Sequence, residues 1–485
     1  MTENNLRPTI GLEVHAQLLT RTKMFCSCPS EYGASPNRNV CPVCLGLPGS
    51  LPMPNRDAVA MAIKLGIAVG AQIAQLTKFD RKNYFYPDLP KGYQISQYDV
   101  PLCTGGSLTI RGSFGEKRVN LVRIHLEEDA GKSVHDDPEA SGTQLDFNRC
   151  GVPLVEIVSA PELASPEEAY AYLTEIRRLV RWLQICDGNM EEGSLRVDVN
   201  VSVASPHAPY GTQVEIKNLN SLHSVVKALE FEIARQSDLI SQGKPILRQT
   251  LLWDEDRQQT RPMRTKERAH DYRYFPEPDL VPLYISAQWR EEIASQIPEL
   301  PHQRRERYIH SFNIKFSDAD LLVSDRSISD FFQDLIEKEQ VDVASAVRWV
   351  TGEALRWRKE LGNGERFMVS CHATAQLIRL EQQGRVSTLA AKSVYEEMAR
   401  TGREDPEAII KERNLEQVRD HQLLEDVVLQ VLRSSPNEVR RFREGDHRLK
   451  GYFIGQVMKA TQGKADPKVT AEILEHLINT SFSSS

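Results

Sequence analysis

The sequence predicts an α+β fold, in which an antiparallel sheet with interspersed helices precedes a wholly helical remainder. The first three hundred residues are rich in Gly, Pro and aromatic side chains, and they contain alternating runs such as 108–111 and 197–203. Such period-two patterning is typical of half-buried strands. From about residue 297 this alternation disappears, and capped helical stretches follow one another between short Gly, Pro or Asn breaks. At 485 residues the chain also exceeds what one hydrophobic core usually supports.

Two helices are predicted within the first region. Ser165 is a suitable N-cap, Pro166 suits the first helical position and Glu168 completes a capping box. An apolar residue then recurs every three or four positions, as in an amphipathic helix, at Ala169, Leu173, Ile176, Val180 and Leu183. The same spacing predicts a second helix over 222–241, which stops near Gly243.

The helical remainder is predicted to divide again near residue 410. Helices are expected over 375–383, 389–400 and 423–432, because Gly or Pro follows each apolar-periodic stretch. We therefore expect three domains, which cover residues 1–296, 297–410 and 411–485.

Composition excludes several classes of protein. A formal net charge of -7 argues against sequence-blind binding of nucleic acid over the whole surface, so any RNA contact must use a local basic patch. No eighteen apolar residues run together, and the N-terminus has no signal-peptide pattern. We expect a soluble protein of the cytoplasm with no membrane partner.

Four of the eight cysteines form two close pairs near the N-terminus. Cys26 and Cys28 are followed, after twelve intervening residues, by Cys41 and Cys44. Paired thiolates of this kind favour tetrahedral zinc, and four cysteine ligands leave no open position for catalysis. The pattern predicts a structural Zn²⁺ site, and the alternative is a group of four buried thiols without metal.

Acidic residues are concentrated in the first region. They include Glu13, the run 127–129, Glu156, the pair 191–192, Asp198 and Glu215. Magnesium prefers carboxylate oxygens, and alternation on a strand places Glu13 and His15 on one face. The alternative is that most of these are solvated surface carboxylates. Gly131-Lys132-Ser133 is not the end of a Walker loop, because the acids that precede it would repel phosphate.

Two loops could bind a nucleotide. Residues 81–94 combine Lys82, Lys91 and several aromatic rings between Pro and Gly residues, and residues 271–279 have a similar composition. A lysine there could neutralise phosphate while the rings stack on a base. The alternative is that both loops simply pack against the core.

Six ordered motifs resemble the B subunit of the aspartyl/glutamyl-tRNA amidotransferase family. They cover residues 10–15, 81–94, 126–133, 191–196, 217–221 and 271–278, and the resemblance continues at 455–461 and 463–467. It implies a catalytic cradle domain at 1–296, a helical domain and a tail domain that reaches the tRNA. It also implies a heterotrimer whose A subunit is a Ser-Lys amidase and whose C subunit is small.

The same resemblance implies a site for ATP and Mg²⁺ in the cradle. It assigns Glu13, His15, Lys82 and Glu128 to catalysis, and Lys82, Tyr84, Lys91, Lys132 and Arg196 to the nucleotide. It places the magnesium near His15, Glu128, Glu156, Asp198 and Glu215. Some members of the family lack the cysteines, so zinc is expected to brace the fold.

The implied reaction is phosphorylation of the side-chain carboxylate of Asp or Glu on misacylated tRNA(Asn) or tRNA(Gln), followed by amidation with ammonia. Three rival classes are a self-sufficient amidohydrolase, a non-catalytic zinc-bearing tRNA adaptor and an ATP-grasp ligase. The first lacks a Gly/Ser-rich stretch for its nucleophile, the second leaves the acidic residues without a role, and the third lacks its Gly-rich lid.

Overall fold

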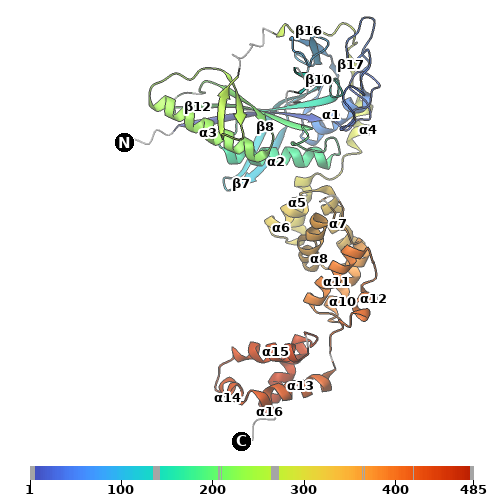
Figure 1. Ribbon diagram of the computed structural model, residues 1–485, viewed down its shortest axis with the longest axis vertical. Coiled ribbons are helices and arrows are strands. Elements are labelled where there is room, and N and C mark those ends of the chain that lie inside the picture. Colours follow the sequence, from blue (N-terminus) through green and yellow to red (C-terminus); the bar gives the residue numbers. More distant parts are fainter. Residues whose placement is uncertain are drawn as a thin grey trace. The chain divides into compact units, whose positions relative to one another are not determined.

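The computed structural model describes residues 6–134, 142–205, 208, 210–263, 272–362, 364, 366–418, 420–461 and 463–480. Asp271, the first residue of the second aromatic motif, lies outside these ranges. The chain divides into two compact units, Met1–Gln303 and Arg304–Ser485, which are here called the N-terminal and C-terminal units (Figure 1). The first contains sheets and helices and the second contains helices, so the α+β prediction is confirmed.

A large, mostly antiparallel sheet forms the centre of the N-terminal unit. Among the described residues its strand order is β15-β14-β13-β12-β1-β11-β8-β6-β2, and β7 pairs with β8 off this path. Only the β13–β14 pair in this set is parallel. The strands are β1 (Arg7–Gln17), β2 (Gln72–Ile73), β6 (Cys103–Thr104), β7 (Ser107–Gly112), β8 (Gly115–Glu128), β11 (Pro153–Ser159), β12 (Leu195–Ala204), β13 (Val214–Leu219), β14 (Thr250–Asp254) and β15 (Gln259–Pro262).

The two faces of this sheet differ in polarity. Along β1, Leu12 and Val14 are buried on one face, and they join the main hydrophobic core together with Leu173 and Leu229. These last two residues belong to α2 (Pro166–Trp182) and α3 (Leu222–Ser241), which Figure 1 shows on one side of the sheet. The opposite face carries Glu13 and other polar residues, because strand side chains alternate.

Both predicted helices of this unit are confirmed. The Ser165 hydroxyl caps α2 by accepting from the Glu168 backbone N–H at 3.1 Å, and the Glu168 carboxylate accepts from the Ala164 N–H at 2.7 Å. Ser221 caps α3 through the backbone N–H of Ser224 at 3.0 Å. Local side-chain caps therefore fix the points where both helices begin.

Smaller sheets bring the two aromatic loops together. β4 (Asp80–Asn83) pairs with β5 (Tyr93–Ser96) on one side and with β16 (Phe275–Pro276) on the other. The remaining elements are β3 (Leu76–Thr77) with β17 (Leu283–Tyr284), β9 (Lys132–Val134) with β10 (Gln144–Asp146), and the helices α1 (Arg56–Ala68) and α4 (Ala287–Ala294).

Helices make up the C-terminal unit, and residues between Leu424 and Ile478 form a hydrophobic cluster of their own. α10 begins at Cys371, four residues before the predicted start, because Ser370 caps it through the Ala373 N–H. The helices are α5 (Pro301–Phe312, which crosses the division), α6 (Phe316–Leu322), α7 (Arg326–Glu337), α8 (Val343–Trp349), the π-helix η2 (Val350–Ala354), α9 (Leu355–Glu360), α10 (Cys371–Gln382), α11 (Thr388–Thr401), α12 (Pro406–Glu412), α13 (His421–Ser434), α14 (Pro436–Arg443), α15 (Leu449–Ala460) and α16 (Pro467–Thr480). No helix in the described part of the chain is long and apolar enough to cross a membrane.

Candidate active site and cysteine centre

A row of polar side chains crosses four neighbouring strands on the face away from α2 and α3. In the strand register, His15 on β1 lies opposite Glu156 on β11 and opposite Arg196 on β12. Glu156 in turn lies opposite His125 on β8. Directly opposed residues share a face, so the sheet itself aligns these four groups.

His15 and two carboxylates form the first group of possible metal ligands. The His15 Nε2 atom lies 3.6 Å from Glu127 Oε1 and 3.6 Å from Glu156 Oε2. His125 Nε2 approaches Glu156 Oε2 to 3.0 Å. The ligand atoms of His15, Glu127 and Glu156 all lie within 4.8 Å of one another, which is close enough for one small cation.

Three carboxylates form a second group beside the first. The ligand atoms of Glu13, Asp198 and Glu215 lie within 4.8 Å of one another, and β1 and β12 place Glu13 directly opposite Asp198. Lys217 Nζ lies 2.5 Å from Asp198 Oδ2, and Asn200 Nδ2 donates to Glu13 Oε1 at 2.9 Å. One lysine thus faces three acids, so negative charge is in excess here.

The pKa values reflect this crowding. Burial, and then the charges of Glu156, Asp198 and Glu215, raise the pKa of Glu13. Burial alone would lower the pKa of His15, but its hydrogen bond to Glu156 and the negative charge of that group raise it to about 9. In the absence of a cation, His15 therefore supplies positive charge to the acids around it.

Lys82 lies among aromatic rings and points toward the acidic face. Its Nζ atom is 5.2 Å from the ring centre of Tyr272 and 6.0 Å from that of Tyr84. Burial opposes its charge, yet the nearby carboxylate of Glu127 leaves the pKa of Lys82 above its ordinary value. The β4–β16 pairing therefore assembles a half-buried cation inside a set of tyrosines.

Lys91 and Glu128 form a buried ion pair apart from both acid groups. The Lys91 Nζ atom contacts Glu128 Oε1, and the same oxygen accepts from the Ile95 backbone N–H at 2.9 Å. The side chains of the pair are 5% and 2% exposed, so both charges depend on this contact.

Arg196 also has a buried acidic partner, whereas Lys132 is exposed. Arg196 Nη2 donates to Asp129 Oδ1 at 3.0 Å, and Arg196 and Arg149 hold the pKa of Asp129 below its ordinary value although burial would raise it. Lys132 lies on β9, outside the large sheet, with its side chain toward solvent.

The structure thus gathers most of the sequence-predicted residues into one region but changes which acids are neighbours. Glu127, not Glu128, joins His15 and Glu156, and His125 completes the row. Neither His125 nor Glu127 belonged to the expected ligand set. The sequence signal that could have found both residues is their spacing of two positions on one strand, which places them on the same face.

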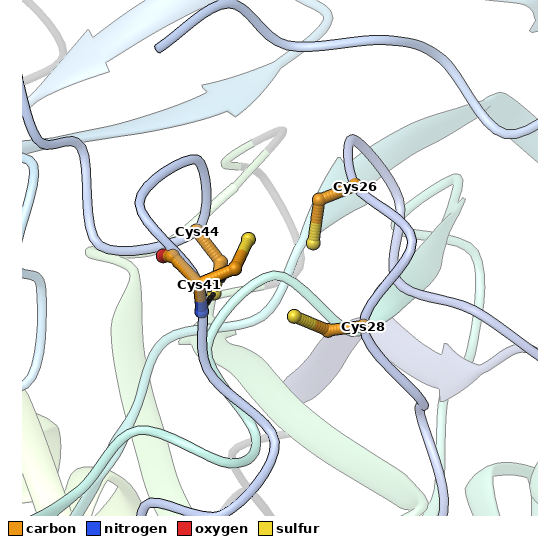
Figure 2. Close-up of side chains that lie close together, drawn as sticks. All are labelled: Cys26, Cys28, Cys41 and Cys44. Carbon is orange, nitrogen blue, oxygen red and sulfur yellow. Dashed lines mark hydrogen bonds between the residues drawn. The ribbon is translucent and has the colours of Figure 1, made fainter.

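The four paired cysteines converge from two loops. Figure 2 shows the Cys26 and Cys28 side chains pointing toward Cys41 and Cys44. All four sulfurs lie within 4.8 Å of one another, and the Cys41 and Cys44 Sγ atoms are 3.9 Å apart. A tetrahedral site with Zn–S bonds of about 2.3 Å needs sulfurs about 3.8 Å apart. The donor set and spacing therefore suit a closed metal site of the zinc type.

Comparison with known proteins gives the same family over nearly the whole chain. Residues 8–291 match the model of the GatB/GatE catalytic domain, and residues 330–478 match that of the GatB domain. The B subunit of the aspartyl/glutamyl-tRNA(Asn/Gln) amidotransferase from Thermoanaerobacter pseudethanolicus is 46% identical over 469 residues, which are 96% of this chain and 98% of that protein.

The proteins of the same name from Thermodesulfovibrio yellowstonii and Chlorobium phaeobacteroides are each 47% identical, over 96% and 97% of this chain and 98% of each relative. Identity at this level over nearly full length covers both the sheet region with its polar row and the helical unit. The chain therefore belongs to the GatB family of aminoacyl-tRNA amidotransferase subunits.

Proposed function

We propose that this chain uses ATP to phosphorylate the side-chain carboxylate of Asp or Glu carried by misacylated tRNA(Asn) or tRNA(Gln), and then replaces the phosphate with ammonia. The observation that carries this proposal is the polar face of the sheet, where Glu13, His15, Glu127 and Glu156 lie beside the half-buried cation Lys82. A non-catalytic adaptor would need no such concentration of charge.

The reaction needs activation because a carboxylate is a poor electrophile with a poor leaving group. Phosphorylation converts one of its oxygens into a good leaving group. Phosphoryl transfer depends mainly on positioning and electrostatic support. Lys82 would offset negative charge on the transferring phosphoryl group, and Tyr84 and Tyr272 fix the direction of its ammonium.

The two acid groups are the proposed magnesium site. The cation would be held by His15, Glu127 and Glu156, or by Glu13, Asp198 and Glu215. The raised pKa of Glu13 reflects its burial and the repulsion of the acids around it, and a bound cation would offset that repulsion. When bound, Mg²⁺ would supply positive charge against the phosphate oxygens. The Lys217 side chain would then balance the acids that remain.

Paired acids and bases near this face suit the transfer of ammonia. Lys91–Glu128 and Arg196–Asp129 are buried pairs of opposite charge. A lining of paired acid and base residues would keep ammonia in its neutral, nucleophilic form. A water-poor passage also protects the acyl phosphate from hydrolysis.

The proposed partners are the A subunit, an amidase that would release ammonia from glutamine, the small C subunit, and the tRNA substrate in the cytoplasm. The C-terminal helices are the proposed tRNA contact. α14 ends in three arginines, Arg440, Arg441 and Arg443, and Arg448 and Lys450 follow it. Such a local patch can bind phosphates although the whole chain is acidic.

Isotope tracing tests the proposed reaction. The assembled enzyme receives misacylated tRNA labelled with ¹⁸O in the side-chain carboxylate, together with ATP and ammonium. Phosphorylation of that carboxylate transfers one labelled oxygen into the released phosphate, and mass spectrometry detects it. Unlabelled phosphate alongside amidated tRNA would contradict the mechanism, and a pure adaptor gives no amidation.

We also propose that the cysteine centre holds structural zinc. Replacing Cys28 by Ser is expected to lower the unfolding temperature of the N-terminal unit by roughly 3 °C, because a lost stabilisation of about one to two kcal/mol shifts a unit of this size by about 1.6 °C per kcal/mol. Differential scanning calorimetry measures it, with and without a chelator. The turnover rate of the assembled enzyme with Cys28→Ser should stay within about threefold of the wild-type rate.

Cys371→Ser is the matched control, because Cys371 lies on α10 and outside the centre. That variant should keep the response of the wild-type chain to the chelator. If the chelator does not change the unfolding temperature of the wild-type chain, no stabilising metal is bound.

A further inference from the structure

Lys23 is a fully buried cation. The N–H groups of its ammonium all donate to atoms in the cysteine loops or in segments beside them. Its side chain is inaccessible to solvent. The Nζ atom donates to Asn39 O at 2.6 Å, to Phe147 O at 3.2 Å and to the Cys44 sulfur at 3.7 Å. A lysine ammonium has three N–H donors, and here each has one acceptor.

The backbone of the same residue contacts the other cysteine pair. The Lys23 N–H donates to Cys28 O at 2.9 Å, and a bridge between Thr22 and Pro29 closes this first cysteine loop. Lys23 thus connects the loop of Cys28, through its backbone, with the loop of Cys44, through its side chain.

The acceptor set explains how the charge of Lys23 is stabilised. Burying an ammonium is costly unless an anion accompanies it. Two of its three acceptors are neutral carbonyls, so the sulfur of Cys44 is the acceptor that can carry a charge.

Resting on the zinc assignment above, we propose that Lys23 is the built-in counter-cation of the cysteine centre, which holds its two loops together and offsets the charge of its thiolates. Zinc with four thiolates carries a formal charge of about −2 in a partly buried place. The Lys23 ammonium removes part of that charge and donates to one of the ligating sulfurs. Partners of this kind, behind the ligands, orient a metal site and tune its affinity.

The position of the centre links it to the Lys91–Glu128 pair. Gly46, two residues after Cys44, lies so close to Lys91 that a Cβ there would be 2.5 Å from the Lys91 Cγ atom. A Cβ at Gly151 would meet Cys44, Lys23 and Glu128 within 3.8 Å. The cysteine loops therefore form one wall beside the buried ion pair.

Lys23→Met tests the proposal, because Met keeps much of the aliphatic volume and removes the charge. Zinc affinity is measured by competition with a chromophoric chelator on the full-length chain. Loss of a partner behind the ligands typically weakens metal binding by about 10- to 100-fold. We expect an increase of that size in the zinc Kd, with one zinc per chain at saturation.

Lys64→Met is the matched control, because Lys64 also donates to a backbone carbonyl, that of Leu183 at 2.9 Å, but belongs to α1. Its zinc Kd should equal that of the wild type. In cobalt-substituted protein, Lys23→Met should also shift the thiolate-to-metal charge-transfer band to lower energy, because the sulfur loses a hydrogen bond.

Each outcome decides the proposal. A zinc Kd raised less than about tenfold in Lys23→Met overturns the role of Lys23 and leaves the zinc assignment standing. A wild-type chain that binds no zinc overturns both. Should Lys23→Met not fold, Lys23→Gln decides instead, since it keeps amide donors for the carbonyls but not the charge. A Kd raised at least tenfold in Lys23→Gln supports the proposal, and a smaller change contradicts it.

Discussion

Glu128→Gln in the assembled amidotransferase is expected to lower the rate of aminoacyl-tRNA amidation by roughly 10²- to 10³-fold. Glutamine cannot neutralise Lys91, which is 5% exposed and bound to the Glu128 carboxylate. Removing one partner of a buried pair leaves an uncompensated charge to which the surrounding groups must adjust, and a displacement of about 1 Å near reacting groups costs about 10²-fold in rate. Single-turnover amidation with preformed misacylated tRNA measures the effect.

Binding of tRNA to this variant should stay within about threefold of the wild type by filter binding, because the substitution lies in the N-terminal unit. Glu162→Gln is the control, since Glu162 is an exposed carboxylate that accepts from Asn120. It should amidate normally. Normal turnover by Glu128→Gln would remove Glu128 from the reacting groups, and loss of tRNA binding would indicate a folding defect.

Glu13→Gln is expected to separate stability from activity. Gln keeps the oxygen that accepts from Asn200 but removes one of three crowded charges. The metal-free chain should become more stable by about 1 kcal/mol, since relieving strain in a functional site commonly stabilises a protein. Turnover should fall by roughly 10²-fold, and the magnesium concentration for half-maximal activity should rise at least tenfold, because a carboxylate ligand is lost.

Chemical denaturation and a magnesium titration of the ammonium-dependent reaction measure the two effects. Glu292→Gln is the control, because Glu292 is exposed on α4 and pairs with Gln288. It should change neither quantity. A Glu13→Gln chain that is less stable, or that needs no more magnesium than the wild type, would contradict a cation site at these acids.

The sequence predicted the elements whose signals are local. Ser165 and Ser221 stand immediately before the helices that they cap, and the apolar stripes that follow were enough to place α2 and α3. Alternation likewise placed Glu13 and His15 on one face of β1. The start of α10 was missed, because the prediction used the glycine that follows the helix and overlooked Ser370 as its cap.

The neighbours in the site could not be predicted, because they depend on strand register. That Glu156 lies between His15 and His125 follows only when β11 is known to lie between β1 and β8. For the same reason Glu128 was predicted beside His15 and Glu156, where the structure has Glu127. Adjacent residues on a strand face opposite ways, so only one of the two can lie on the polar face. Lys23 gave no signal, because its acceptors are mainly backbone carbonyls.

The central position of β1 has a consequence for biosynthesis. This strand leaves the ribosome before its neighbours β11 and β12, which follow about 140 to 190 residues later. At about 5–20 residues per second of translation, the nascent strand waits on the order of ten seconds or more for its partners. Its apolar residues, among them Leu12 and Val14, stay unpaired during that interval. Slow translation lengthens this exposure of an apolar strand, so the topology favours fast synthesis of the segment between β1 and β12.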